Sequence, residues 1–306
     1  MSGTIWQDGW QSWEAVPGVT LDVFHRQGRQ TSKNAVIIAG IHGDEYEGPA
    51  AIAELVALLD PARLSGSLTA VPVANPPALT AGTRTSPDGG NLARCFPGDP
   101  DGGPTERLAA ALFNRLAAGA NYLIDLHSGG VEYLFLPLAG FYGEPSPENR
   151  SFSAARQFGL PALWQLPETS GVLSWEASKR GTVAIGAEYC GAGQLSFEGV
   201  TAYREGIIRC ITDWGLYEAP MPPSARQQIL LGDWLLAQET GLFRSRVSLG
   251  QRVAAGQVLA ATVTPAGAVI EQFTAASNGM IGGLRSKAFI REGNWAVLVL
   301  KECHVE

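Results

Sequence analysis

Residues 34–48 read Asn34-Ala-Val-Ile-Ile-Ala-Gly-Ile-His-Gly-Asp-Glu-Tyr-Glu-Gly48, and they carry the clearest signal for the architecture. The short apolar run over 34–41 predicts a buried strand. From Gly48 to Leu59, the apolar residues recur at the spacing of one helix face, which predicts a helix. A strand, a polar loop and a helix in this order are typical of an α/β fold.

The same alternation continues on the C-terminal side of this stretch. It predicts further strands over 68–74, 121–127 and 183–188, and helices over 104–118 and 199–214. Pro104 and Glu106 suit the first turn of a helix. We therefore expect an α/β domain over residues 1–220, with a mainly parallel mixed sheet flanked by helices.

The pattern changes at Tyr217-Glu-Ala-Pro-Met-Pro-Pro-Ser224, where three prolines predict a stiff connector. Beyond it we find short β-type runs separated by glycines, and Asn278-Gly279 is a strong turn signal. We interpret residues 225–306 as a smaller, all-β, barrel-sandwich-like domain. The alternative is a β extension of the main domain.

The composition excludes several classes of protein. The 306 residues are 45% apolar and 17% charged, an ordinary globular balance. With 22 Lys and Arg against 29 Asp and Glu, the net charge is −7, which disfavours nucleic-acid and anionic-membrane partners. No apolar run is long enough to span a bilayer, and the N-terminus lacks the features of a signal peptide. We expect a cytoplasmic protein with free thiols at its four scattered cysteines; a homo-oligomer is possible.

Metal-ligating residue types stand at the ends of two predicted strands. His42 and Glu45 follow the first strand, and His127 ends the strand that contains Asp125. The carboxyl edge of an open α/β sheet is where ligands bind. Two histidines and one glutamate form the ligand set of a catalytic zinc with one open position. A histidine at a strand end can also be a hydrogen-bonded loop residue, and spacing alone leaves both interpretations open.

Further motifs appear in a fixed order along residues 34–215. They are His42-Gly-Asp-Glu45, Asn75-Pro-Pro77, Arg84, Gly89-Gly-Asn-Leu-Ala-Arg-Cys-Phe-Pro-Gly98, Asp125-Leu-His-Ser128 and Ala187-Glu-Tyr-Cys-Gly191. With these motifs the chain resembles the succinylglutamate desuccinylase/aspartoacylase family, a branch of the zinc carboxypeptidase-like hydrolases. The resemblance implies a zinc carboxypeptidase-like fold.

The resemblance implies one Zn²⁺ per chain, held by His42, Glu45 and His127. It assigns Glu188 as a general base that takes a proton from water and then delivers it to the leaving nitrogen. Zinc in such a site activates water near neutral pH.

The resemblance also implies roles for residues around the metal. Arg84 would stabilise the oxyanion, and Arg94 would bind a substrate carboxylate through its two-pronged guanidinium. Asn91 stands where the family has Asp and is a candidate substrate ligand. Ala93 stands where the family has Asn, so one polar contact to the substrate is missing. Asp125 is a candidate hydrogen-bond partner of a zinc-bound imidazole.

These roles imply a zinc-dependent amidohydrolase, a deacylase that cleaves the amide of an N-acyl amino acid or a similar small carboxylate-bearing molecule. Two alternatives stay open. One is a metallocarboxypeptidase acting on short peptides. The other is a non-catalytic protein that binds a small metabolite through zinc, with Ala93 as the first sign of lost activity.

Overall fold

The computed structural model describes residues 6–30 and 33–302. The four strands at its centre are β3 (Asn34–Ala39), β4 (Ser67–Val71), β5 (Tyr122–His127) and β8 (Val183–Gly191). They pair in parallel in the order β4-β3-β5-β8. These are the strands that the sequence predicts, and their apolar runs are buried because helices cover both faces.

Further strands extend this sheet in both directions. They are β1 (Gly9–Val16) and β2 (Val19–Gln27) beside β4, and β6 (Tyr133–Phe141) and β7 (Ala162–Gln165) beyond β8. The mixed α/β sheet is confirmed. Parallel pairing prevails at its centre, whereas most pairings toward its two ends are antiparallel, so "mainly parallel" holds only for the central part.

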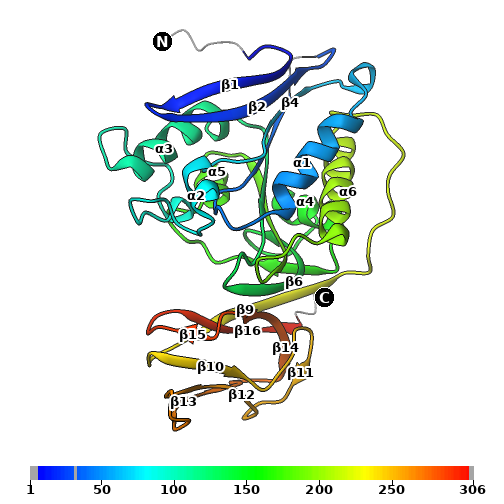
Figure 1. The fold of residues 1–306 in the computed structure, drawn as a ribbon. Helices are drawn as coiled ribbons and strands as arrows, with labels where there is room; N and C mark the ends of the chain where they lie inside the picture. Colours follow the sequence, from blue (N-terminus) through cyan, green and yellow to red (C-terminus); the bar gives the residue numbers. More distant parts are fainter. Residues whose placement is uncertain (1–5, 31–32, 303–306) are drawn as a thin grey trace.

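The helices form two layers (Figure 1). One face is covered by α1 (Glu47–Leu58), α4 (Arg150–Phe158) and α6 (Phe197–Asp213), whose apolar sides enter one core cluster. The other carries α3 (Pro104–Leu112), its π-helical continuation η3 (Phe113–Ala117) and α5 (Leu173–Ser178), which enter a second cluster. Shorter helical segments are η1 (Pro61–Arg63), α2 (Pro76–Ala81) and η2 (Leu92–Arg94).

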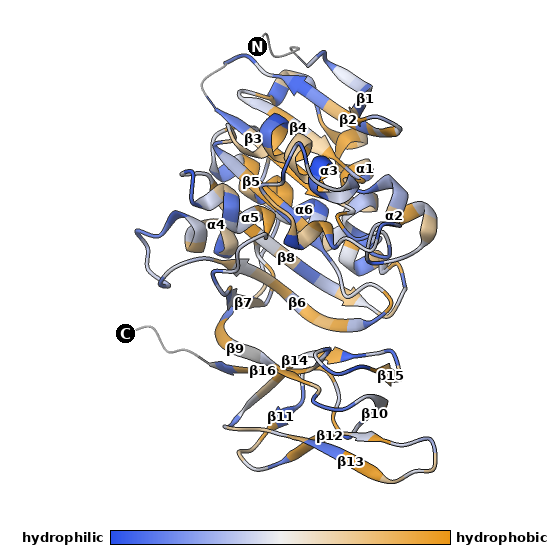
Figure 2. Ribbon diagram, turned by 90° about the vertical axis from the view of Figure 1, so that its left-hand side faces the viewer, coloured by the Kyte–Doolittle hydropathy of each residue, from blue (hydrophilic) through white to orange (hydrophobic). Residues whose placement is uncertain are grey.

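The described part of the C-terminal region consists of strands and loops. Its strands are β9 (Gln228–Leu236), β10 (Gly241–Ser245), β11 (Arg252–Val253), β12 (Val258–Val263), β13 (Val269–Thr274), β14 (Gly279–Arg285), β15 (Phe289–Ile290) and β16 (Trp295–Glu302). The expected β-rich region is therefore present. Figures 1 and 2 show β10, β12 and β13 at the end of the molecule farthest from the N-terminus.

Two pairings join this region to the central sheet. β9 pairs in parallel with β7, and β14 pairs antiparallel with β6, so that one sheet of 12 strands runs through the described chain. A second sheet of four strands, β13-β12-β10-β15, encloses a separate apolar cluster with part of the first. The region thus has its own core and also continues the main sheet. The division near residues 220–225 stays a prediction.

Two remaining expectations concern the thiols and the membrane. Cys95, Cys190 and Cys210 are free thiols, as predicted, and Cys303 lies outside the described residues. Within residues 6–30 and 33–302, no helix combines the length and the apolar character needed to cross a bilayer.

Candidate active site

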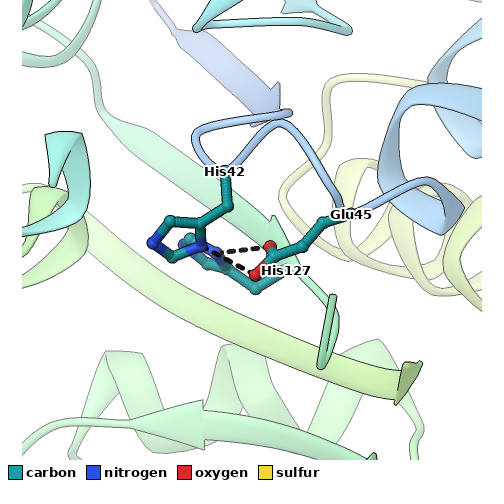
Figure 3. A group of neighbouring side chains, drawn as sticks. All are labelled: His42, Glu45 and His127. Carbon is teal, nitrogen blue, oxygen red and sulfur yellow. Dashed lines mark hydrogen bonds and ion pairs between the residues drawn. The ribbon is translucent and has the colours of Figure 1, made fainter. Parts of the chain in front are cut away.

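Two loops at the carboxyl ends of neighbouring strands bring His42, Glu45 and His127 together (Figure 3). His42 and Glu45 lie between β3 and α1, and His127 is the last residue of β5. One ligand atom from each side chain lies within 4.8 Å of the other two. Gly43 permits the tight turn, because a Cβ atom there would lie 2.0 Å from the carbonyl carbon of Ala78.

In both histidines, Nδ1 lies near the Glu45 carboxylate and Nε2 lies near a second side-chain oxygen. Nδ1 of His42 lies 2.7 Å from Oε1 of Glu45, and Nδ1 of His127 lies 2.9 Å from Oε2. Nε2 of His42 lies 3.2 Å from Oδ1 of Asn91, and Nε2 of His127 lies 3.2 Å from Oδ1 of Asp125. An acceptor on the outer nitrogen is the usual way to orient a metal-ligating histidine. The donor set therefore fits a zinc ion bound through both Nδ1 atoms and Glu45.

His42 and Glu45 have the protonation states that metal binding requires, whereas His127 in the metal-free protein favours its protonated form. Burial, reinforced by Arg84, lowers the pKa of His42 to about 4, so its imidazole is neutral at pH 7. Burial opposes the charge of Glu45, but His42 and His127 hold its pKa well below the ordinary value. Burial also opposes the charge of His127, but Asp125 and Glu45 raise its pKa well above the ordinary value. Metal binding would therefore release a proton from His127.

Two further carboxylates brace the loop between β3 and α1. Oδ2 of Asp44 accepts a hydrogen bond from the backbone N–H of Val131 at 2.9 Å. Oε1 of Glu47 accepts one from the backbone N–H of Ser196 at 3.1 Å. Asp44 and Glu47 are both buried. They tie the metal-binding loop to the segments that follow β5 and β8.

Glu188 lies beside this group on β8. It is the register partner of His127 on β5, and both residues line the same pocket. Its Oε2 atom is buried and has no hydrogen-bond partner among the described residues. Burial raises the pKa of Glu188 well above the ordinary value; His127 opposes this rise and Glu45 adds to it. A carboxyl group of this kind is suited to accepting a proton and giving it up again.

Arg84 and Arg94 line the same pocket. Nη1 of Arg84 donates to Oε1 of Glu45 at 3.1 Å, and its guanidinium lies 5.8 Å from the ring centre of Tyr133. Arg94 is an exposed residue, and its guanidinium lies 5.8 Å from the ring centre of Trp295. The structure thus brings both predicted arginines to the pocket that His42 and Glu188 line.

Asn91 and Ala93 lie on η2 and its N-terminal cap. Oδ1 of Asn91 accepts from the backbone N–H of Ala93 and contacts His42, and Asn91 is not among the residues that line the pocket. The Asn91 side chain is therefore placed to orient His42. Ala93 does line the pocket, and its small side chain leaves space beside Arg94.

The pocket has a volume of about 450 Å³. Part of the pocket wall comes from the C-terminal strands: Trp234 and Leu236 of β9 and Trp295 of β16. The sequence alone assigns these three residues no role. A tryptophan in a short β-type run is the only signal that could have pointed to them, and it does not reveal which sheet edge the strand joins.

Known proteins share both the fold and the sequence pattern. A family model described as the succinylglutamate desuccinylase/aspartoacylase catalytic domain matches residues 31–212, more than half of the chain. The chain belongs to this succinylglutamate desuccinylase/aspartoacylase family. It is 31% identical over 283 residues to the N-alpha-acetyl-L-2,4-diaminobutyric acid deacetylase of Halomonas elongata, covering 89% of this chain and 83% of the relative.

Solved structures of the succinylglutamate desuccinylase/aspartoacylase family have the same mixed α/β architecture. The protein of Rhodobacter sphaeroides has a TM-score of 0.85 at 25% identity and covers 97% of both chains. The product-bound ectoine utilization protein EutE (DoeB) of Ruegeria pomeroyi has a TM-score of 0.85 at 27% identity and covers 98% of this chain and 97% of its own. The similarity thus extends over the β-rich C-terminal region.

Proposed function

We propose that the chain is a zinc-dependent amidohydrolase that removes the acyl group from an N-acyl amino acid. The observation that carries the proposal is the convergence of both Nδ1 atoms and the Glu45 carboxylate beside Glu188, whose buried Oε2 atom has no hydrogen-bond partner among the described residues. The relative from Halomonas elongata supports a deacylase, since it is named as a deacetylase of an N-acetyl amino acid.

His42, Glu45 and His127 would hold the zinc, which, when bound, polarises the carbonyl and lowers the pKa of water toward about 7. Glu188 removes a proton from the attacking water as the new C–O bond forms. It then delivers that proton to the nitrogen as the C–N bond breaks. The products are a carboxylic acid and a free amine, so atoms and charge balance with one water consumed.

The two arginines would orient the substrate and stabilise the negative charge that develops during the reaction. Arg84 reaches the rim of the metal-binding group and is placed to stabilise the negative charge that develops on the carbonyl oxygen. Arg94 lines the pocket beside Trp295, and its guanidinium is suited to holding a carboxylate by two parallel hydrogen bonds. Asn91 and Asp125 would fix the rings of the two histidines.

The test combines metal analysis with product analysis. The purified chain, loaded with zinc, is incubated with a panel of N-acyl amino acids and with short peptides, and the released amine is quantified. Release from the N-acyl amino acids supports the proposal. Trimming of peptides alone would show a carboxypeptidase, and binding of ligands without any turnover would show a non-catalytic metabolite-binding protein.

A further inference from the structure

Beside the uncharged polar residues Tyr142, Thr169 and Ser174, much of the pocket is lined by large apolar side chains from several elements. They are Leu138, Trp164, Leu166, Val172, Leu173, Trp234, Leu236 and Trp295. The carboxylates among the described lining residues are Asp125 and Glu188, and both lie at the metal-binding group. Among the residues that the structure describes, the apolar wall therefore contains no anionic side chain that could pair with a substrate cation.

Two tryptophans form one side of this apolar region. The rings of Trp234 and Trp295 are stacked, with their centres 5.1 Å apart and an angle of 12° between their planes. The guanidinium groups of Arg84 and Arg94 lie 6.0 and 5.8 Å from the ring centre of Trp295. Leu236 extends the same wall and is 45% exposed. The two arginines and the apolar side chains of the pocket thus meet at Trp295.

The contact between Arg94 and Trp295 determines which part of a bound substrate lies against the apolar wall of Trp234, Trp295 and Leu236. In an amino acid, the carboxylate and the side chain leave the same carbon atom. If Arg94 holds the carboxylate, the side chain lies within reach of Trp295. The volume of about 450 Å³ also exceeds what a short side chain would fill, because pockets of roughly 300–1,000 Å³ enclose ligands of drug size.

We infer that the substrate is an N-acyl amino acid whose own side chain is bulky and apolar, and that Trp295, Trp234 and Leu236 select it. This inference rests on the proposed function and narrows its substrate class. It separates the chain from the Halomonas elongata deacetylase, whose named substrate is derived from a diamino acid. An ammonium group on this wall would lie near two arginines and, among the described lining residues, without an acidic partner, which is electrostatically unfavourable.

The first experiment varies the amino-acid side chain and the acyl group of the substrate separately. We expect kcat/KM for N-acetyl-L-phenylalanine and N-acetyl-L-leucine to exceed that for N-acetyl-L-2,4-diaminobutyrate and N-acetylglycine by at least about tenfold, the scale of selection by an apolar pocket. A preference for the diaminobutyrate derivative would overturn the inference and leave the deacylase intact. A larger gain from lengthening the acyl group of N-acylglycines would place the apolar group in the acyl half and overturn it too.

Binding measurements separate this inference from the proposed function. Calorimetry with the free amino acids should show tighter binding of L-phenylalanine than of L-2,4-diaminobutyrate, whether or not the chain hydrolyses an amide. If zinc-loaded protein hydrolyses none of the compounds, the deacylase proposal is refuted. The relative affinities for the two free amino acids would still show whether the wall binds an apolar side chain. Equal binding of both amino acids would overturn the inference.

A matched pair of variants tests the wall by adding the same negative charge either on it or outside the pocket. Leu236→Glu should lower the preference for the phenylalanine derivative over the diaminobutyrate derivative by about tenfold or more, because it adds an anion beside the side chain. Leu242→Glu adds the same charge on β10, where Leu242 is 37% exposed and does not line the pocket. It should leave the preference unchanged. If both variants change it equally, Leu236 does not contact the substrate and the inference fails.

Discussion

Glu188 and His127 are register partners on the neighbouring parallel strands β8 and β5, so their side chains lie on the same face of the sheet. Two pairs earlier, Asp125 stands opposite Gly186, which also lines the pocket. The proposed base and one proposed ligand therefore share a rigid frame of backbone hydrogen bonds, which keeps the distance between them fixed.

This arrangement predicts the effect of Glu188→Gln. The amide has the same size but cannot take up a proton, so turnover should fall by at least about 10²-fold, the usual contribution of a general base. Zinc content should stay at the wild-type level, because Glu188 is not one of the three proposed ligands. Rates and metal content are measured on the same preparation.

Glu198→Gln provides the control. Glu198 lies in the first turn of α6 and does not line the pocket, so this variant should keep wild-type turnover. Wild-type activity in Glu188→Gln would assign the base to another carboxylate.

His127→Ala should lose bound zinc. It removes one of three protein ligands, and the remaining His42 and Glu45 cannot complete the coordination of a catalytic zinc. Metal content is measured after dialysis against a weak chelator. His25→Gln is the comparison, because His25 is also buried but hydrogen-bonds to Thr69 away from the site. Retention of zinc in His127→Ala would refute the ligand set.

Asn91 should influence metal affinity through the orientation of His42. Asn91→Ser keeps a hydroxyl that can cap η2 but is too short to reach His42, so zinc should bind about 10–100-fold more weakly. Asn91→Asp keeps both contacts and offers a stronger acceptor, so its affinity should equal or exceed that of the wild type. Competition with a fluorescent chelator measures both. Equal affinities in all three proteins would show that Asn91 does not act on the metal.

Arg94→Ala should raise KM for a carboxylate-bearing substrate by roughly 10- to 100-fold, because a charge-assisted hydrogen-bonded contact contributes about 1.5–3 kcal/mol. The amidated form of that substrate should be poor for the wild type and indifferent to the mutation. Arg107→Ala is the control, since Arg107 is exposed on α3 and donates to the carbonyl oxygen of Gly102. Equal hydrolysis of acid and amide forms by the wild type would exclude carboxylate recognition by Arg94.

The central sheet could be predicted because its strands are short apolar runs, each followed by a polar loop. Other elements have weaker local signals. Residues 9–14 alternate between half-buried and exposed positions, and their hairpin with residues 19–27 depends on a turn at Gly18 with φ of +79°. β6 contains Pro137, which disfavours a strand, and its register with β8 shifts between Phe135 and Leu138.

The candidate site was predictable to the extent that its chemistry lies in compact motifs. His42 and Glu45 are three residues apart, and such a pair can be recognised in a sequence. The contact between Asn91 and His42 joins residues 49 positions apart, and the position of Trp295 depends on the pairing of β16 with β9 and of β9 with β7. Such long-range pairings are set by the packing of the whole sheet, which local periodicity does not encode.

The strand β16 is the last in the described chain, and Trp295 is its first residue. Trp295 lies 107 positions after Glu188 in the sequence. At a translation rate of about 5–20 residues per second, the ribosome adds Trp295 roughly 5–20 s after Glu188. The nascent chain thus carries all its proposed metal ligands and its proposed base before Trp295 can complete the tryptophan wall of the pocket.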